Sequence, residues 1–241
     1  MSTRVAVCQV PDIQENIEGA VDWIEKFTTD AQKNGVSLIC FPECFLQGYL
    51  TEKGSAEKQS IELSSKAFNE ILERLKKYTP TIVFGLIENE NENLYNTAVI
   101  IKNGTLAGRY RKTHLLKGEL IFKTGYEYPV FKTGNLIFGV NICYDTQFPE
   151  GAKRVAMQGA TLLLCPANNM MRYETAEKFK HLHHKIRAQL AIENKIWIMS
   201  ADVTGERNGR ISYGPTSAIN PNGEIVNQVP LMETGIIIVD V

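Results

Sequence analysis

The chain has 241 residues, of which 44 % are hydrophobic and 22 % are charged, and its formal net charge is −1. These values are typical of a globular protein with a sizeable core, and they give no electrostatic reason to expect a nucleic-acid or anionic-membrane partner. No apolar run approaches the ~20 residues that a membrane span needs. The start, MSTRVAVCQV, does not resemble a signal peptide, and five cysteines without framework spacing favour a reducing compartment. We therefore expect a cytoplasmic protein.

Strand-like and helix-like patterns alternate along the chain. Apolar residues at helical spacing predict helices over 16–33, 56–78, 149–158 and 173–193. Apolar runs bounded by turn residues predict strands over 5–10, 36–41, 81–88, 95–101, 106–110, 135–142, 160–165, 196–202, 213–220, 224–228 and 235–241. So many strands, with hairpin turns at 102–104 and at "NPNG", predict an α/β fold of two packed mixed sheets with helices outside.

Three of the predicted strands are followed directly by a reactive side chain. Glu43 comes after Pro42, which ends the run 36–41, and Lys112 comes after the run 106–110. Cys143 comes directly after the run 135–142. Sites in α/β sheets gather at the carboxyl ends of strands. We therefore expect Glu43, Lys112 and Cys143 to converge.

These residue types suit nucleophilic attack on a carbonyl or nitrile carbon. A free thiol titrates at about 8.5, so Cys143 needs a nearby cation or a base that removes its proton. Lys112 is the candidate cation, and Glu43 is the candidate base, which then protonates the departing amine and activates water. Lys112 and the backbone N–H of Tyr144 are the candidate donors to the oxyanion. Glu119, seven residues after Lys112, is assigned as a supporting carboxylate that keeps the lysine charged.

The order of these stretches resembles that of the nitrilase superfamily of carbon–nitrogen hydrolases. The resemblance rests on "FPECFLQGY", "GRYRKTHL", "KGELIFKTG" and "GVNICYDTQFPEGAKRVAMQGATLLLCPAN". The later "AIENKIWIMSADVTG" and "GPTSAINPNGEI" also match, so the resemblance covers nearly the whole chain. Any one stretch alone is a weak signal, whereas four catalytic stretches in this order are specific.

The resemblance implies a four-layer αββα sandwich, and we expect residues 1–241 to form a single carbon–nitrogen hydrolase domain. It implies a catalytic triad of Glu43, Lys112 and Cys143 with Glu119 in support, no cofactor, and a homodimer or larger homo-oligomer. A tyrosine directly after the nucleophile, here Tyr144, resembles amidases more than nitrilases or N-carbamoyl hydrolases.

The chain departs from the family pattern in three places. Leu190 stands where an arginine often precedes the "AxEN" helix end, and Arg187 lies one helical turn earlier. Gln147 stands where ω-amidase-like members tend to have arginine, which counts against a dicarboxylate monoamide as the substrate. The chain ends on its last predicted strand at Val241, whereas many members continue into a tail that joins subunits.

Other residues near the predicted site have less distinctive patterns. Four of them are candidates to bind the substrate, although each also suits simple packing: Tyr144, Tyr49, Asn168 and Phe148. His181, His183 and His184 lie together on the predicted helix 173–193, but no HExxH motif or cysteine pair accompanies them. We interpret these histidines as a polar or partly buried helix face and predict no metal site.

We predict a hydrolase that cleaves a small-molecule amide to a carboxylic acid and ammonia through a cysteinyl thioester. Nitrilase or N-carbamoyl amide hydrolase activity on the same triad stays open as an alternative. A non-catalytic binding protein of the same fold is the rival from another class, and it would be marked by a damaged triad. A thiol-redox role would be marked by a CxxC pair, which the sequence lacks.

Overall fold

The computed structural model describes residues 2–241, which contain fourteen strands. The strands are β1 (Arg4–Pro11), β2 (Leu38–Cys40), β3 (Thr81–Glu90), β4 (Asn93–Lys102), β5 (Thr105–Arg111), β6 (Val130–Thr133), β7 (Leu136–Val140), β8 (Leu162–Pro166), β9 (Met171–Arg172), β10 (Trp197–Arg207), β11 (Arg210–Ser212), β12 (Ser217–Ile219), β13 (Ile225–Gln228) and β14 (Gly235–Asp240). The α-helices are α1 (Ile17–Lys33), α2 (Lys53–Gln59), α3 (Lys66–Leu75), α4 (Pro149–Met157), α5 (Tyr173–Phe179) and α6 (Leu182–Asn194). Two 3₁₀ helices complete the set, η1 (Lys117–Glu119) and η2 (Cys143–Gln147).

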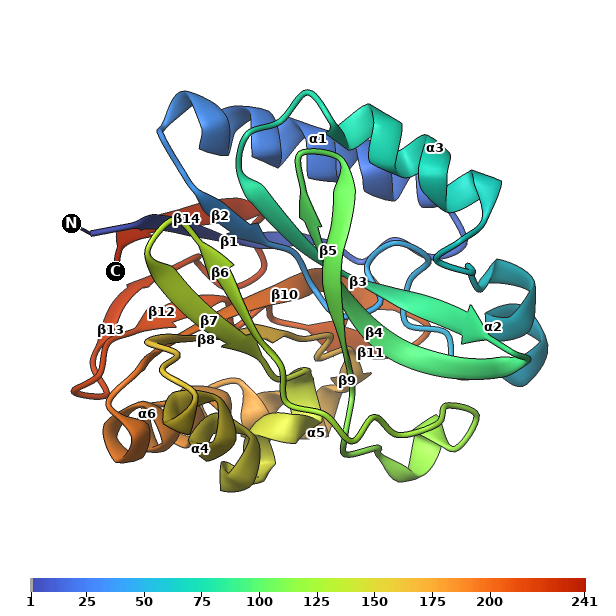
Figure 1. Cartoon of the computed structure of the whole chain (residues 1–241). Coiled ribbons are helices and arrows are strands. Elements are labelled where there is room, and N and C mark those ends of the chain that lie inside the picture. The colour runs from blue at the N-terminus through green and yellow to red at the C-terminus, as the bar shows by residue number, and fades with distance from the viewer. Residues whose placement is uncertain (1) are drawn as a thin grey trace.

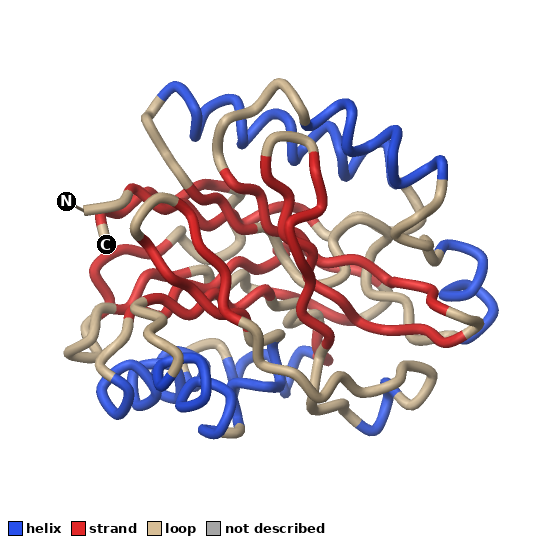
Figure 2. The backbone as a smooth tube through the Cα atoms, in the orientation of Figure 1, coloured by secondary structure: helices blue, strands red, loops and turns tan. Residues whose placement is uncertain are grey.

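The strands form two sheets that are joined where β1 and β10 pair (Figure 2). One sheet has the order β5-β4-β3-β2-β1, with β14 beside β1. The other has the order β10-β8-β7-β6, with β12 and β13 added beside β10. β1 and β10 run parallel from the Gln9–Asp202 pair to the Pro11–Thr204 pair. Each sheet contains parallel and antiparallel pairs, so both are mixed, as predicted.

Alternation along the strands places apolar side chains on both faces of each sheet. In β1, Val5 and Val7 belong to the core between the sheets, whereas Ala6, Cys8 and Val10 belong to the core under α1 and α3. The second sheet has its own outer core against α4 and α6. Figure 1 shows the resulting layers, with α1 and α3 above the strands and α4 and α6 below them. The predicted four-layer αββα sandwich is therefore confirmed.

Two predicted helices are each broken in the structure. The range 56–78 divides into α2 and α3 because Ile61 forms a bridge to Glu88, and Ser65 then caps α3 by accepting a hydrogen bond from the Phe68 N–H at 3.2 Å. The range 173–193 divides into α5 and α6. β6, β9 and β11 were not predicted, because these two to four residues do not lie within a longer apolar run of the kind that contains β2 and β12.

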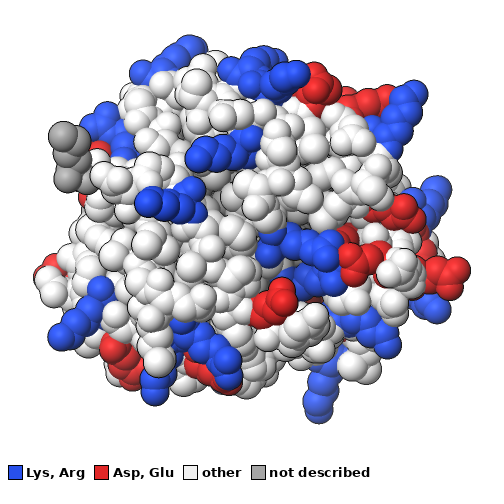
Figure 3. Space-filling view, viewed as in Figure 1, with Lys and Arg blue, Asp and Glu red and all other residues white. Residues whose placement is uncertain are grey.

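Charged side chains of both signs lie on the surface (Figure 3), and one cysteine is partly exposed. Lysine and arginine side chains lie interspersed with acidic side chains on the face shown in Figure 3. No helix within residues 2–241 is long and apolar enough to cross a bilayer. Four of the cysteines are buried, whereas Cys143 is partly exposed. Cys143 is thus the most exposed of the five cysteines.

Candidate active site

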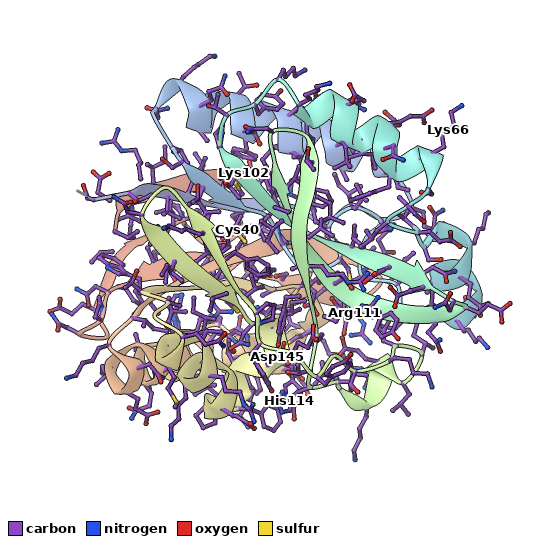
Figure 4. All side chains as sticks on the ribbon, viewed as in Figure 1. Cys40, Lys66, Lys102, Arg111, His114 and Asp145 are labelled. Carbon is purple, nitrogen blue, oxygen red and sulfur yellow. The ribbon has the colours of Figure 1, made fainter. Side chains whose placement is uncertain are left out.

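The three predicted reactive residues all lie just beyond strand ends. Glu43 follows β2, Lys112 follows β5 directly, and Cys143 is the first residue of η2, after β7. Figure 4 labels two residues near this place, His114 and Asp145, which lie close together in the lower centre of the molecule. The segment after β5 and the helix η2 after β7, which belong to different sheets, therefore meet at this place.

The cysteine is held on a strained turn. Cys143 has φ 45°, in the left-handed region, and so has Cys44, beside Glu43, with φ 48°. A non-glycine residue in this region carries a backbone cost that the surrounding structure must offset, and such residues cluster at functional sites. Thr146 fastens the turn by donating its hydroxyl to the Cys143 carbonyl at 2.8 Å. The turn holds Cys143 just beyond the end of β7.

Lys112 sits between two carboxylates and is fully enclosed with them. Its Nζ lies 2.7 Å from Glu43 Oε1 and 2.7 Å from Glu119 Oε1, and all three side chains are at most 1 % exposed. Asn96 on β4 donates its Nδ2 to the same two oxygens, at 2.7 Å and 3.3 Å. The structure therefore brings Glu43, Lys112 and Glu119 together as a buried ionic cluster.

The outer carboxylate oxygens of this cluster are also satisfied. Glu43 Oε2 accepts the Asn168 backbone N–H at 3.0 Å, and Glu119 Oε2 accepts the Leu116 backbone N–H at 2.7 Å. Every carboxylate oxygen in the cluster thus has a donor. Buried charges are tolerated when they are paired and hydrogen-bonded in this way.

Burial and charge act against each other in this cluster. Burial raises the pKa of Glu43, Glu119 raises it further, and Lys112 with Asn96 offsets only part of this. Burial alone would lower the pKa of Lys112, but the negative charges of Glu43 and Glu119, and that of Cys143 when it is ionised, outweigh it and raise that pKa. Lys112 is therefore held as an ammonium, while Glu43 has the proton affinity that a general base needs.

The sulfur has few partners by comparison. Within residues 2–241, its one hydrogen bond is to Asn169 Oδ1, at 3.9 Å. Burial and the Glu43 charge raise the pKa of the Cys143 thiol well above its usual value, although Lys112 lowers it. The expected cationic effect of Lys112 is present but too small to form a thiolate. The resting nucleophile is a thiol, so it depends on a base.

Asp145 is a central residue of the site that the sequence reasoning missed. Its carboxylate accepts the Ile142 backbone N–H at 2.9 Å and the Tyr110 hydroxyl at 2.8 Å. It also accepts the backbone N–H groups of Thr113, at 3.2 Å, and His114, at 2.8 Å. Asp145 therefore ties the turn that carries Cys143 to the segment after Lys112. An aspartate at a turn that follows a strand was the available signal.

The four predicted pocket residues divide between the two sides of the site. Tyr49 lies beside the ionic cluster, with its ring centroid 6.0 Å from Lys112 Nζ, and Asn168 contributes the backbone N–H described above. Tyr144 packs edge-on against Phe148, with centroids 5.3 Å apart, and Phe148 stacks on His114 at 3.8 Å. Their contacts with a substrate stay predictions.

The helix α6 and its histidines lie behind the sulfur side. His184 is buried, and burial together with the Arg187 charge lowers the pKa of His184 to about 4. The same causes lower the pKa of His183 to about 3. Arg187 is buried too and donates to Ser200 Oγ at 2.9 Å and to the Pro215 carbonyl at 3.1 Å. These contacts place Arg187 beneath β10 and β12.

Three sequence matches bear on what this site does. A family model described as "Carbon-nitrogen hydrolase" matches residues 4–241. A nitrilase of Pyrococcus abyssi is 31 % identical over 210 residues, which cover 84 % of this chain and 76 % of that protein. A deaminated glutathione amidase of Dictyostelium discoideum is 30 % identical over 263 residues, covering 95 % and 82 %.

Solved structures show the same fold. The crystal structure of an amidase from Nesterenkonia sp. superimposes with a TM-score of 0.86 at 23 % identity, covering 99 % of this chain and 90 % of that one. Another form of that amidase, a mutant with the acetamide moiety of fluoroacetamide added covalently at its active-site cysteine, superimposes with a TM-score of 0.88.

Proposed function

The chain belongs to the carbon–nitrogen hydrolase family, and from that premise we propose that it hydrolyses a small amide through a thioester on Cys143. It is an amidase-type enzyme for C–N bonds other than peptide bonds. The observation that carries this proposal is the buried ion pair beside the strained cysteine, in which Lys112 Nζ lies 2.7 Å from Glu43. The amidase with an acetamide moiety added at its cysteine supports a nucleophilic role for the cysteine in this fold.

The first half of the reaction forms the thioester. Glu43 takes the proton of Cys143, and the sulfur attacks the amide carbonyl carbon. Lys112 and the backbone N–H of Tyr144 donate to the resulting oxyanion, where one such donor is typically worth ~10²–10³ in rate. Glu43 then returns its proton to the nitrogen, the C–N bond breaks, and ammonia leaves.

The second half releases the acid. Glu43 removes a proton from water, which attacks the thioester carbonyl, and the same oxyanion donors act again. The C–S bond breaks, the carboxylic acid leaves, and the thiol regains its proton from Glu43. Throughout, Glu119 accepts a hydrogen bond from Lys112 and keeps it charged. A nitrile would enter the same site as a thioimidate.

Some parts of this assignment rest on the sequence alone. Four expectations stay predictions. They are a single domain over residues 1–241, a homodimer or larger homo-oligomer, a cytoplasmic location, and the absence of a cofactor or metal. The choice of an amide over a nitrile or an N-carbamoyl compound is part of the proposal.

The test is ammonia release from a panel of small amides, nitriles and N-carbamoyl compounds. We expect turnover of amides by the native enzyme, an acyl adduct on Cys143 in mass spectra, and a loss of at least about 10³-fold in Cys143→Ala. Cys8→Ala, a change at a buried cysteine of β1, is the control and keeps full activity. Activity that survives in Cys143→Ala contradicts the mechanism, and an inert panel favours a binding protein of this fold.

A further inference from the structure

Asn169 forms a bridge between the reactive sulfur and a buried carboxylate. It follows β8 and is 4 % exposed. Its side-chain amide contacts Cys143 Sγ through Oδ1, at 3.9 Å, and Asp202 Oδ2 through Nδ2. Its backbone N–H also donates to Asp202 Oδ1, at 3.1 Å. The proposed mechanism uses neither Asn169 nor Asp202.

The chemistry of Asp202 fixes which way this amide points. An ionised carboxylate can only accept hydrogen bonds, so the amide atom that faces it must be the donor Nδ2. The amide oxygen is then the atom that faces Cys143. An oxygen can only accept, so the hydrogen bond between them is donated by the thiol S–H. Asn169 therefore favours the protonated form of Cys143.

Asp202 itself has little freedom to move. It is fully buried, and Oδ1 accepts a second hydrogen bond from the Val203 backbone N–H at 2.9 Å. Its backbone N–H donates to Thr216 Oγ1 at 3.0 Å. Burial raises the pKa of Asp202 to about 6, although Arg187 and Asn169 oppose this, so the carboxylate is ionised at neutral pH. The Asn169 amide is thus held in one orientation.

We propose that Asp202 and Asn169 are positioning residues that keep the resting Cys143 as a thiol, with its S–H directed at Asn169 Oδ1. The inference rests on the proposed function, in which Cys143 is the nucleophile. The proton moves to Glu43 only after the S–H turns away from Asn169. In this arrangement the sulfur is unreactive at rest and becomes a nucleophile within the substrate complex.

The test measures the reactivity of Cys143 without turnover. Methyl methanethiosulfonate, a small thiol reagent that is not an amide, is applied from pH 5 to pH 10, and the peptide that contains Cys143 is quantified by mass spectrometry. In Asp202→Asn the amide loses its fixed orientation, so we expect the apparent pKa of Cys143 to fall by about one unit and modification at neutral pH to become about tenfold faster. Asn169→Ala removes the acceptor oxygen and should shift the profile in the same direction.

The double variant separates this role from a direct charge effect. Glu43, Lys112, Cys165 and Asp202 all act on the pKa of the thiol, so losing the Asp202 charge lowers that pKa even without Asn169. If Asp202 also acts through Asn169, Asp202→Asn produces a clearly smaller shift in the Asn169→Ala background than in the native protein, because only the direct charge effect remains there. An equal shift in both backgrounds, or no shift in either single variant, overturns the inference.

One control variant and one fallback measurement keep the result interpretable. Ser212→Ala removes a buried hydroxyl that donates to the Val203 carbonyl on β10 at 2.7 Å, and it should leave the profile unchanged. If Asp202→Asn fails to fold, the profile of Asn169→Ala alone still decides, because an unshifted profile there refutes the role of Asn169. The proposed function has its own separate test in the amide turnover of Cys143→Ala.

Discussion

The two sides of the site differ in how completely their polar groups are bonded. On the side of Glu43, Lys112 and Glu119, every carboxylate oxygen accepts a hydrogen bond, and most contacts lie between 2.7 and 3.0 Å. On the side of Cys143, the sulfur has a single hydrogen bond within residues 2–241, at 3.9 Å. The buried ring nitrogens Nε2 of His183 and His184, behind that side, have no partner within the described residues.

This difference matches two different tasks. The ionic side must be preorganised, because the charges that stabilise an oxyanion are effective only when they need not rearrange. The sulfur must form and break a covalent bond, so its contacts must be weak enough to exchange during the reaction. The predictions below test each side, in order of expected effect.

Breaking the ionic side should have the largest effect. Lys112→Met leaves Glu43 and Glu119 buried without a cation, so we expect a loss of about 3–5 kcal/mol in unfolding free energy and of at least about 10²-fold in kcat. The loss should shrink at low pH, because protonation removes the uncompensated charges. Urea unfolding at pH 8 and pH 5, together with ammonia release, measures this. The exposed Lys66→Met is the control, and an equal loss in both variants contradicts the account.

The histidine behind the sulfur side should make that side sensitive to acid. The folded-state pKa of His184 is about 4, against about 6.5 in the unfolded chain. Its contribution to stability is therefore present above pH 6.5 and is lost as the pH falls through about 4. As the pH falls from 7 to 4, the unfolding free energy of His184→Phe should rise by ~1–3 kcal/mol relative to that of the native protein. Urea unfolding at these pH values measures this difference. Parallel curves of unfolding free energy against pH for the two proteins would count against the prediction. His181→Gln, a change at an exposed histidine, is the control.

Asn96 should show the smallest effect of the three. Its Nδ2 lowers the pKa of Glu43 through the hydrogen bond at 2.7 Å. Asn96→Leu should therefore move the acid limb of the kcat/KM profile to higher pH and reduce kcat about tenfold, the size expected for one hydrogen bond to a charged group. Asn93→Ala, at the start of the same strand, is the control. An unmoved acid limb would show that Glu43 does not set it.

The sequence predicts the residues at strand ends better than it predicts the residues whose hydrogen bonds link one strand end to another. Pro42 and the turn after Ile142 mark strand ends, so Glu43 and Cys143 were proposed from these local patterns taken together and from the resemblance to the family. The Asp145 partners on β5 and in the segment after it lie 31 to 35 residues away along the chain, and Asn169 and Asp202 are 33 residues apart. No periodicity reports such contacts, because they depend on which strand ends meet in the folded sheets. Asn96, a polar residue inside a predicted apolar strand, was visible but its partners were not.

The Asp145 carboxylate also has a mechanical consequence. It accepts a hydrogen bond from the Tyr110 hydroxyl on β5 and another from the Ile142 backbone N–H just beyond β7. These two strands belong to different sheets. Any shear of one sheet against the other must stretch these bonds before it can separate the ammonium from the thiol. The ammonium and the thiol therefore keep their relative position when the sheets move. The loops around them can vary in shape without changing that position.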